Sequence, residues 1–284
     1  MITVVIPAKN ESEGIEKVIF EISNTFKKNE LEIIVINDGS TDDTSLRAQN
    51  AGAIVLNNPN SLGYGASIKR GISSASYDMI ATIDADLTYP SNYLPRLIDL
   101  YQEGFDMVIG ARQGRHYDES MLKKILRSFL RFMVEYTSGA KAPDVNSGMR
   151  VFSKKTSEKY FSHLCNTFSF STSLTLAYYM SQKFVGYVDI PYEKRIGKSK
   201  VSLYKDALRT IQYILEITIF YNPLKIFILL SSFILVISSL SLLLGIYFKI
   251  KFFYFFFLIG VATSIINIAL GFLAVLLRQI LIKE

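Results

Sequence analysis

The sequence predicts an α/β domain with a mainly parallel sheet, followed by a pair of membrane-spanning helices. Three observations support this class. Short apolar runs alternate with helix-like segments through the N-terminal part of the chain. These runs show no polar alternation, which is typical of a sheet covered on both faces. Near the end of the chain, two long stretches contain no ionisable side chain.

The expected strands are apolar runs bounded by polar turns. They are Ile2–Ile6, Ile33–Ile36, Ala53–Leu56, Met79–Ile83 and Met107–Ile109. The helix-like segments between them cover about residues 11–27, 42–50, 63–76 and 91–103. Strands that alternate with helices form βαβ units, so we expect the architecture of nucleotide-binding α/β folds.

The two uncharged stretches are Ile226–Phe248 and Phe252–Leu277. A helix of about 20 apolar residues crosses a bilayer core of roughly 30 Å, so a transmembrane hairpin is predicted and a pair of buried core helices is the alternative. The N-terminus, "MITVVIPAKNE", has no basic leader or cleavage site and indicates a strand rather than a signal peptide. A single cysteine, Cys165, excludes an intrachain disulfide and fits a reducing compartment.

Two basic, amphipathic segments lie before the hairpin. In Met121–Tyr136 apolar side chains occupy one helical face and lysines and arginines the other, which indicates either a surface helix on the sheet or a helix in the membrane interface. The second runs from about Val201 to Tyr221, and Pro223 is expected to break the helix after it. The formal charge is +6, and its basic excess near these segments favours anionic lipid headgroups or a phosphorylated lipid as partner.

We therefore predict three parts. Residues 1–200 form a cytoplasmic α/β domain that includes an interface helix at about 118–137. Residues 201–223 form an amphipathic juxtamembrane helix, and residues 224–284 form the hairpin. Because two spans return the chain to the same side, both termini are expected in the cytoplasm.

Polar segments follow four of the predicted strands. They are "PAKNE" (7–11), "NDGSTDDT" (37–44), "DAD" (84–86) and "GAR" (110–112). Each alone is an ordinary turn, but ligands of parallel sheets bind outside the carboxyl ends of strands, where all four fall. Asp84 and Asp86 would repel each other, and carboxylates suit hard cations such as Mg²⁺ or Mn²⁺ that also bind substrate phosphates. A solvated turn is the alternative.

The order of these segments resembles a known family. "VVIPAKNE", "NDGSTDDT", "GYGASIKRGI", "DADLTYP", "VIGAR", "DVNSGMRVF" and "RIGKSKVS" follow one another as in family 2 glycosyltransferases. The similarity spans about residues 1–205 and is greatest to the polyprenyl-phosphate branch, which includes dolichyl-phosphate mannose synthases and bacterial undecaprenyl-phosphate glycosyltransferases. It implies a glycosyltransferase A fold, transfer from a nucleotide-sugar to polyprenyl phosphate, and a membrane protein of the bacterial inner membrane type. We expect this transfer to depend on Mg²⁺ or Mn²⁺ and to invert the anomeric configuration.

The resemblance also implies roles for single residues. The nucleotide pocket would be lined by Pro7, Ala8, Glu11, Asp38 and Ala85. The metal would be held by Asp84, Asp86 and Thr88, although Thr88 stands where the family often has glutamine. Donor or acceptor phosphates would be held by Arg112, Arg195, Ser199 and Lys200. The sugar and acceptor site would be shaped by Asp144, Ser147 and Arg150, with Ser147 and Arg150 at the acceptor phosphate. The catalytic residues would be Asp86, Asp144, Arg112 and Arg195.

Elementary chemistry agrees with this assignment. A phosphate monoester has its second pKa at about 6, so the acceptor is already nucleophilic and needs placement rather than a strong base. Guanidinium groups bind phosphate through two hydrogen bonds, although each arginine could equally form a structural ion pair. Asp144 could be a base, a sugar ligand or a strand cap, and we favour an orienting role.

Other functions remain open at this point. The acceptor could be another lipid or a glycan, or the chain could be a non-catalytic scaffold. Processive synthases of this superfamily usually carry a Trp-containing motif and more spans, and this chain has no tryptophan. A homo-oligomer is possible by resemblance, and no nucleic-acid partner is expected.

Overall fold

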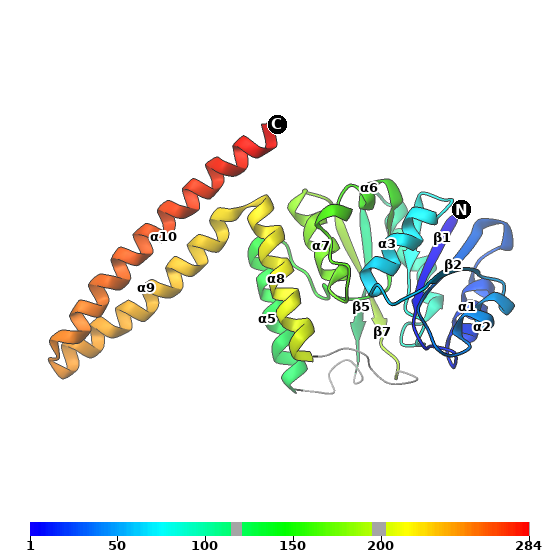
Figure 1. Cartoon of the computed structure of the whole chain (residues 1–284), viewed down its shortest axis with the longest axis horizontal. Coiled ribbons are helices and arrows are strands. Elements are labelled where there is room, and N and C mark those ends of the chain that lie inside the picture. Colours follow the sequence, from blue (N-terminus) through cyan, green and yellow to red (C-terminus); the bar gives the residue numbers. More distant parts are fainter. Residues whose placement is uncertain (115–120, 195–202, 284) are drawn as a thin grey trace. The chain divides into compact units, whose positions relative to one another are not determined.

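The structure is a computed structural model that describes residues 1–114, 121–194 and 203–283 (Figure 1). The predicted site residues Arg195, Ser199 and Lys200 lie outside the described residues. The chain divides into two compact units, Met1–Ile214 and Leu215–Glu284, and each is described by itself below.

The first unit is built on a seven-stranded sheet with the order β3-β2-β1-β4-β6-β5-β7. Its strands are β1 (Ile2–Ala8), β2 (Leu31–Asp38), β3 (Ile54–Asn58), β4 (Met79–Thr82), β5 (Met107–Gln113), β6 (Arg150–Ser153) and β7 (Val185–Pro191). β6 is antiparallel to β4 and β5, and the other neighbouring pairs are parallel. The predicted mainly parallel α/β class is therefore confirmed. All five predicted strands form, whereas β6 and β7 were missed.

Helices cover both faces of this sheet (Figure 1). One face packs against α1 (Ile15–Thr25), α2 (Thr44–Asn50) and α4 (Leu94–Gln102), and the other against α3 (Tyr64–Ser74) and α7 (Phe170–Met180). Alternate residues of β1 point to opposite faces: Val4 and Ile6 belong to the first core and Val5 to the second. Because helices cover both faces of the sheet, both faces of its strands are apolar, and the strand sequences therefore show no polar alternation.

The remaining elements of this unit are short or amphipathic. Short helical turns are found at Lys28–Glu30, Ser91–Tyr93, α6 (Lys154–Glu158) and Phe161–His163. Both predicted amphipathic segments are helical, as α5 (Met121–Ser138) and α8 (Leu203–Tyr221), which continues into the second unit. On α5, Val134 is buried, whereas Ile125, Phe129 and Phe132 are exposed. The helix α5 thus exposes several large apolar side chains while its C-terminal half packs against the domain.

The second unit contains two long helices, α9 (Pro223–Phe248) and α10 (Lys251–Lys283), which lie antiparallel (Figure 1). Both are long and apolar enough to cross a membrane. α9 begins with Pro223 directly after Asn222, so the predicted break is confirmed. Lys249 adopts the left-handed conformation (φ 57°) and turns the chain between the helices. Two apolar helices joined by a tight turn therefore form, as expected for the predicted hairpin.

Side chains of the two helices hydrogen-bond across the hairpin. The hydroxyl of Ser231 donates to the carbonyl of Ser264 at 3.2 Å, and that of Ser264 donates back to the carbonyl of Ser231. The Asn267 amide donates to the Phe227 carbonyl at 3.0 Å and to the Ser231 hydroxyl at 2.9 Å. Small residues allow this approach, as at Gly260, where an added β-carbon would lie 2.4 Å from Ser238 Cβ.

Candidate active site

The sheet topology brings the predicted polar segments to one edge. β1, β2 and β4 run parallel, and β5 has the same direction because β6 is antiparallel to both β4 and β5. β1 ends at Ala8, β2 at Asp38, and β4 two residues before Asp84, while Arg112 lies near the end of β5. In register, Pro7 and Ala8 stand beside the end of β2. Segments far apart in sequence therefore share one edge of the sheet, as predicted.

The loops after β1 and β2 are joined by hydrogen bonds. The Glu11 amide donates to Thr44 Oγ1 at 2.8 Å, and the Asn10 amide donates to Ser40 Oγ at 2.9 Å. The Thr41 amide donates to Asn10 Oδ1 at 2.8 Å. The loop after β2 thus holds the main chain at Glu11 in place.

Asp38 uses its carboxylate to fix the loop that leads into α3. It accepts hydrogen bonds from Asn58 Nδ2 and from the Leu62 amide at 2.8 Å, from Ser61 Oγ at 2.7 Å and from the Gly63 amide at 3.0 Å. Burial alone would raise the pKa of Asp38, but these hydrogen bonds outweigh it and hold the pKa below its usual value. Asp38 therefore determines where α3 begins.

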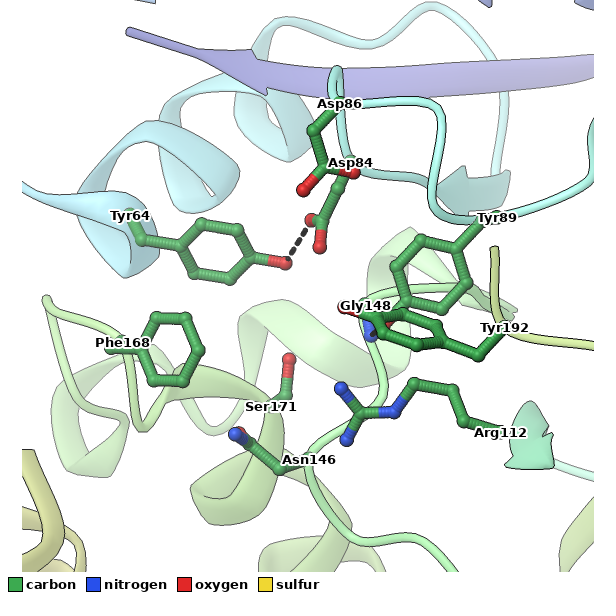
Figure 2. Close-up of a pocket in the computed structure, with 10 residues that line it drawn as sticks. All are labelled: Tyr64, Asp84, Asp86, Tyr89, Arg112, Asn146, Gly148, Phe168, Ser171 and Tyr192. Carbon is green, nitrogen blue, oxygen red and sulfur yellow. Dashed lines mark hydrogen bonds between the residues drawn. The ribbon is translucent and has the colours of Figure 1, made fainter. Parts of the chain in front are cut away.

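A pocket opens at this edge of the sheet. Its lining residues are Tyr64, Asp84, Asp86, Tyr89, Arg112, Asn146, Gly148, Phe168, Ser171 and Tyr192. Figure 2 shows the two aspartates on one side of it and Arg112 with Asn146 on the other. Three predicted site residues, Asp84, Asp86 and Arg112, thus meet in one pocket. Four further predicted residues lie at the same sheet edge without lining this pocket: Pro7, Ala8, Glu11 and Asp38.

Each aspartate of the pocket accepts a hydrogen bond from a hydroxyl group. Tyr64 Oη donates to Asp84 Oδ1 at 2.9 Å, and Thr88 Oγ1 donates to Asp86 Oδ1 at 2.5 Å. Leu87 has a left-handed backbone (φ 62°), and the Thr88 amide also reaches Asp86 Oδ1, at 3.1 Å. Burial, and next the charge of Asp84, raises the pKa of Tyr64 well above its usual value, so this hydroxyl keeps its proton.

The donor set suits a cation that substrate phosphates would also bind. No group of three or more His, Cys, Asp or Glu side chains able to hold a metal occurs in the part of the chain that the structure describes. Mg²⁺ usually keeps several ligands from water or phosphate and takes one or two from protein carboxylates. Asp84 and Asp86 line the same pocket and supply such a pair, whereas Thr88 directs its hydroxyl toward Asp86. Ala85, between them, is buried, and an added β-carbon on Gly14 would lie 2.7 Å from its carbonyl.

On the opposite side, Arg112 and Asp144 form a two-pronged ion pair. Arg112 Nε donates to Asp144 Oδ2 at 2.6 Å, and Nη2 donates to Oδ1 at 2.8 Å. The guanidinium also lies 5.4 Å from the centre of the Tyr192 ring. Burial opposes ionisation of Asp144, but the charge and hydrogen bonds of Arg112 outweigh it and lower its pKa. Asp144 is thus an ionised carboxylate that orients Arg112.

Arg150 occupies a different place from the one that the sequence suggested. It is 1% exposed, and its guanidinium donates to the Ser147 and Val145 carbonyls at 2.7 and 2.8 Å and to Thr175 Oγ1 at 2.7 Å. This position does not favour the predicted direct contact with an acceptor phosphate, because the donors point into the protein and hold residues 145–147. The Ser147 hydroxyl, also predicted to contact the acceptor, is buried without a hydrogen-bond partner.

Sequence reasoning missed seven of the lining residues. They are Tyr64, Tyr89, Asn146, Gly148, Phe168, Ser171 and Tyr192. The first four lie within segments already singled out, "GYGASIKRGI", "DADLTYP" and "DVNSGMRVF", so nearness to those segments was an available signal. Phe168, Ser171 and Tyr192 carry no such signal, because only the packing of α7 and β7 brings them to the pocket.

Comparisons with known proteins identify relatives of this arrangement. Residues 3–161 match the model of the family described as Glycosyl transferase family 2. The undecaprenyl-phosphate 4-deoxy-4-formamido-L-arabinose transferase of Yersinia enterocolitica is 27% identical over 252 residues, which cover 82% of this chain and 72% of that protein. The protein of the same name from Proteus mirabilis is 29% identical over 161 residues, which cover 53% of this chain and 48% of that protein.

Solved structures show the same fold. A glucosyl-3-phosphoglycerate synthase from Mycobacterium tuberculosis, in complex with Mn²⁺, uridine diphosphate and glucosyl-3-phosphoglycerate, aligns with a TM-score of 0.61 and 24% identity. The alignment covers 77% of this chain and 80% of that chain. A structure of the same synthase with Mg²⁺ and uridine diphosphate gives a TM-score of 0.62 and 24% identity, with 77% and 79% covered. The fold of the first unit is therefore of the glycosyltransferase A type.

Proposed function

The chain belongs to glycosyl transferase family 2 and is a glycosyltransferase, and we propose that it transfers a sugar from a nucleoside-diphosphate sugar to a polyprenyl phosphate. The observation that carries this proposal is the pocket that brings Asp84 and Asp86 together with Arg112. The proposed product is a monosaccharide linked to the lipid through one phosphate. The relatives named as undecaprenyl-phosphate transferases support the acceptor class.

The aspartate side of the pocket would bind the donor diphosphate through a divalent cation. Asp84 and Asp86 would hold Mg²⁺ or Mn²⁺, which would offset the charge of the leaving nucleoside diphosphate. The related synthase structures contain Mn²⁺ or Mg²⁺ with uridine diphosphate, which supports a divalent cation in this fold. Pro7, Ala8, Glu11, Asp38 and Ala85 would border the nucleotide, and Thr88 would orient Asp86.

The arginine side would place the acceptor phosphate. Asp144 holds the Arg112 guanidinium in one orientation, so Arg112 can meet a phosphate oxygen without losing side-chain freedom at that step. The low pKa of Asp144 argues against its acting as a general base near neutral pH. The acceptor phosphate needs no such base, because its oxygen is already anionic. The predicted phosphate contacts of Arg195, Ser199 and Lys200 belong to this proposal.

The chemical step would be a single in-line displacement. The lipid phosphate oxygen attacks the anomeric carbon, the bond to the nucleoside diphosphate breaks, and the configuration at that carbon inverts. The rings of Tyr64, Phe168, Tyr89 and Tyr192 line the pocket and would limit access of water to the reacting carbon. A product with the anomeric configuration of the donor would contradict this mechanism.

Two features of the chain favour a lipid acceptor at a membrane surface. The apolar hairpin fits a bilayer, and α5 exposes Ile125, Phe129 and Phe132 next to basic side chains such as Lys124 and Arg131. Such a helix binds to the interface of an anionic bilayer. We propose that the catalytic domain and both termini lie in the cytoplasm, with residues 1–200, 201–223 and 224–284 as catalytic, juxtamembrane and membrane parts.

The test is transfer of radiolabelled sugar from a panel of nucleotide-sugars to undecaprenyl phosphate by the full chain in detergent. We expect one donor to give a chloroform-soluble, acid-labile lipid, and Asp86→Ala to lower the rate by on the order of 10³-fold, since a metal contributes several kcal/mol. Glycolipid and oligosaccharide acceptors form the second arm. Transfer to one of these, with none to undecaprenyl phosphate, would contradict the proposed acceptor.

A further inference from the structure

The first aspartate of the pocket is held by a side chain from α3. Tyr64 Oη donates to Asp84 Oδ1 at 2.9 Å (Figure 2). The Tyr64 ring is itself restrained, because Phe168 packs against it with ring centres 5.9 Å apart. Tyr64 follows Gly63, which has a positive φ of 102° and whose amide donates a hydrogen bond to Asp38 Oδ2 at the start of the helix. The hydroxyl therefore comes from a restrained part of the domain.

The other side of Asp84 is closed by the main chain at Gly148. A β-carbon at this position would lie 2.7 and 2.8 Å from the two carboxylate oxygens, which is closer than real β-carbons approach. Both main-chain polar groups of Gly148 are hydrogen-bonded. Its amide donates to Tyr89 Oη at 2.8 Å, and its carbonyl accepts from Thr82 Oγ1 at 2.7 Å. The Asp84 carboxylate thus lies between a hydroxyl and a fixed glycine.

Asp86 also accepts a hydrogen bond from a hydroxyl group, which belongs to Thr88. Thr88, which is fully buried, donates to Asp86 Oδ1 through both its hydroxyl and its amide. For Asp84 a hydroxyl comes from Tyr64, which lies twenty residues away in sequence. Groups that orient a metal ligand typically change metal affinity by about 10- to 100-fold when they are removed.

We propose that Tyr64 is a positioning residue that orients Asp84 for the divalent cation, as Thr88 does for Asp86. The proposal rests on the proposed function, since it assumes a cation at these two aspartates. It gives the "GYGASIKRGI" segment, which the sequence singled out, a role in presenting a hydroxyl to the cation site.

The experiment measures Mn²⁺ binding to the full chain in detergent, with Mn²⁺ alone as the probe and electron paramagnetic resonance as the readout. Tyr64→Phe keeps the ring and removes the hydroxyl, and we expect the dissociation constant for Mn²⁺ to rise about tenfold. In transfer assays, the Mn²⁺ concentration for half-maximal rate should rise by a similar factor while the KM for the lipid acceptor stays unchanged. The matched control is Tyr178→Phe, because the Tyr178 hydroxyl is buried without a hydrogen-bond partner and does not line the pocket.

Asp86→Ala distinguishes a failure of the proposed role of Tyr64 from a failure of the proposed cation site. If Asp86→Ala weakens Mn²⁺ binding and Tyr64→Phe matches the wild type, the role of Tyr64 is overturned and the cation site stands. If Asp86→Ala leaves Mn²⁺ binding unchanged, the cation site of the proposed function is overturned. Equal weakening by Tyr64→Phe and Tyr178→Phe would indicate a general packing effect and would also overturn the specific role of Tyr64.

Discussion

The pocket and the apolar hairpin both bury hydroxyl groups, but the partners of these groups differ. In the pocket, Tyr64 and Thr88 donate to the carboxylates of Asp84 and Asp86. In the hairpin, Ser231 and Ser264 exchange hydrogen bonds with backbone carbonyls of the opposite helix. A hydrogen bond to a charged group fixes the direction of that charge, whereas one to a carbonyl joins two helices. The first kind should therefore control chemistry and the second kind stability.

The largest effect on stability should come from breaking the ion pair of the pocket. Arg112→Ala leaves the Asp144 carboxylate buried without its cation, which costs about 3–5 kcal/mol, and should lower the thermal unfolding temperature of the full chain. Lys183→Ala is the control, because it breaks a more exposed pair with Asp106 and should cost about 0–1 kcal/mol. Equal effects of the two variants would show that the Arg112 pair is no more than a surface contact.

A smaller effect is expected when the space beside Asp84 is filled. Gly148→Ala places a methyl group against the carboxylate and should cost about 1–3 kcal/mol by overpacking. Because the displaced group is a proposed metal ligand, the dissociation constant for Mn²⁺ should rise as well. Gly186→Ala is matched to it, since its methyl group would meet the side chains of Phe105 and Leu100. That control should lose stability and keep its Mn²⁺ affinity. A similar loss of Mn²⁺ affinity in Gly186→Ala would show that the effect of Gly148→Ala comes from lower stability and not from Asp84.

The hairpin should respond more weakly and without a catalytic effect. Asn267→Leu removes the donors to the Phe227 carbonyl and the Ser231 hydroxyl, and such bonds contribute on average about 0.6 kcal/mol in membranes. Thr263→Leu is the control, because its hydroxyl donates within its own helix to Ile259. Differential scanning fluorimetry should give a lower transition for Asn267→Leu alone. If Asn267→Leu lost transfer activity at a temperature where it remains folded, the hairpin bonds would affect chemistry as well as stability, contrary to this expectation.

Acid should distinguish the regions as well. The pKa of Asp144 is lowered in the fold, mainly by the charge of Arg112 acting against burial, so its stabilisation is complete above the usual value of 3.8. As the pH falls through the lower folded value, this stabilisation is lost, because the unfolded chain takes up the proton first. Unfolding measured from about pH 5 downward should be less pH-dependent in Asp144→Asn than in the wild type. The carbonyl acceptors of the hairpin do not titrate, so Asn267→Leu should keep the wild-type pH dependence.

The sequence indicated the fold more fully than the site. Strands β1 to β5 are apolar runs between polar turns and were predicted, whereas β6 begins with Arg150 and has four residues, and β7 alternates in burial. The DAD aspartates and Arg112 were predicted because their position after strands carries a signal. Tyr64 and Gly148 were not, because their contacts to Asp84 depend on how α3 and the loop before β6 pack against the sheet.

Arg150 shows a further limit of sequence reasoning. Its residue type and its segment both suggested a phosphate contact, yet it is buried and donates to the carbonyls of Val145 and Ser147 and to Thr175 of α7. A guanidinium suits a phosphate and a pair of carbonyls equally well, since both are hydrogen-bond acceptors. Residue type alone therefore could not tell a binding arginine from a structural one.

In the proposed mechanism, Asp84 and Asp86 form a cation site that transfer requires. The most direct measurement is the rate of sugar transfer to undecaprenyl phosphate by the full chain, first stripped of metal with a chelator and then titrated with Mn²⁺ or Mg²⁺. We predict that transfer stops on chelation and returns saturably with the added cation, and that Asp86→Ala does not recover at any concentration. Full transfer by the stripped wild-type chain would contradict the claim.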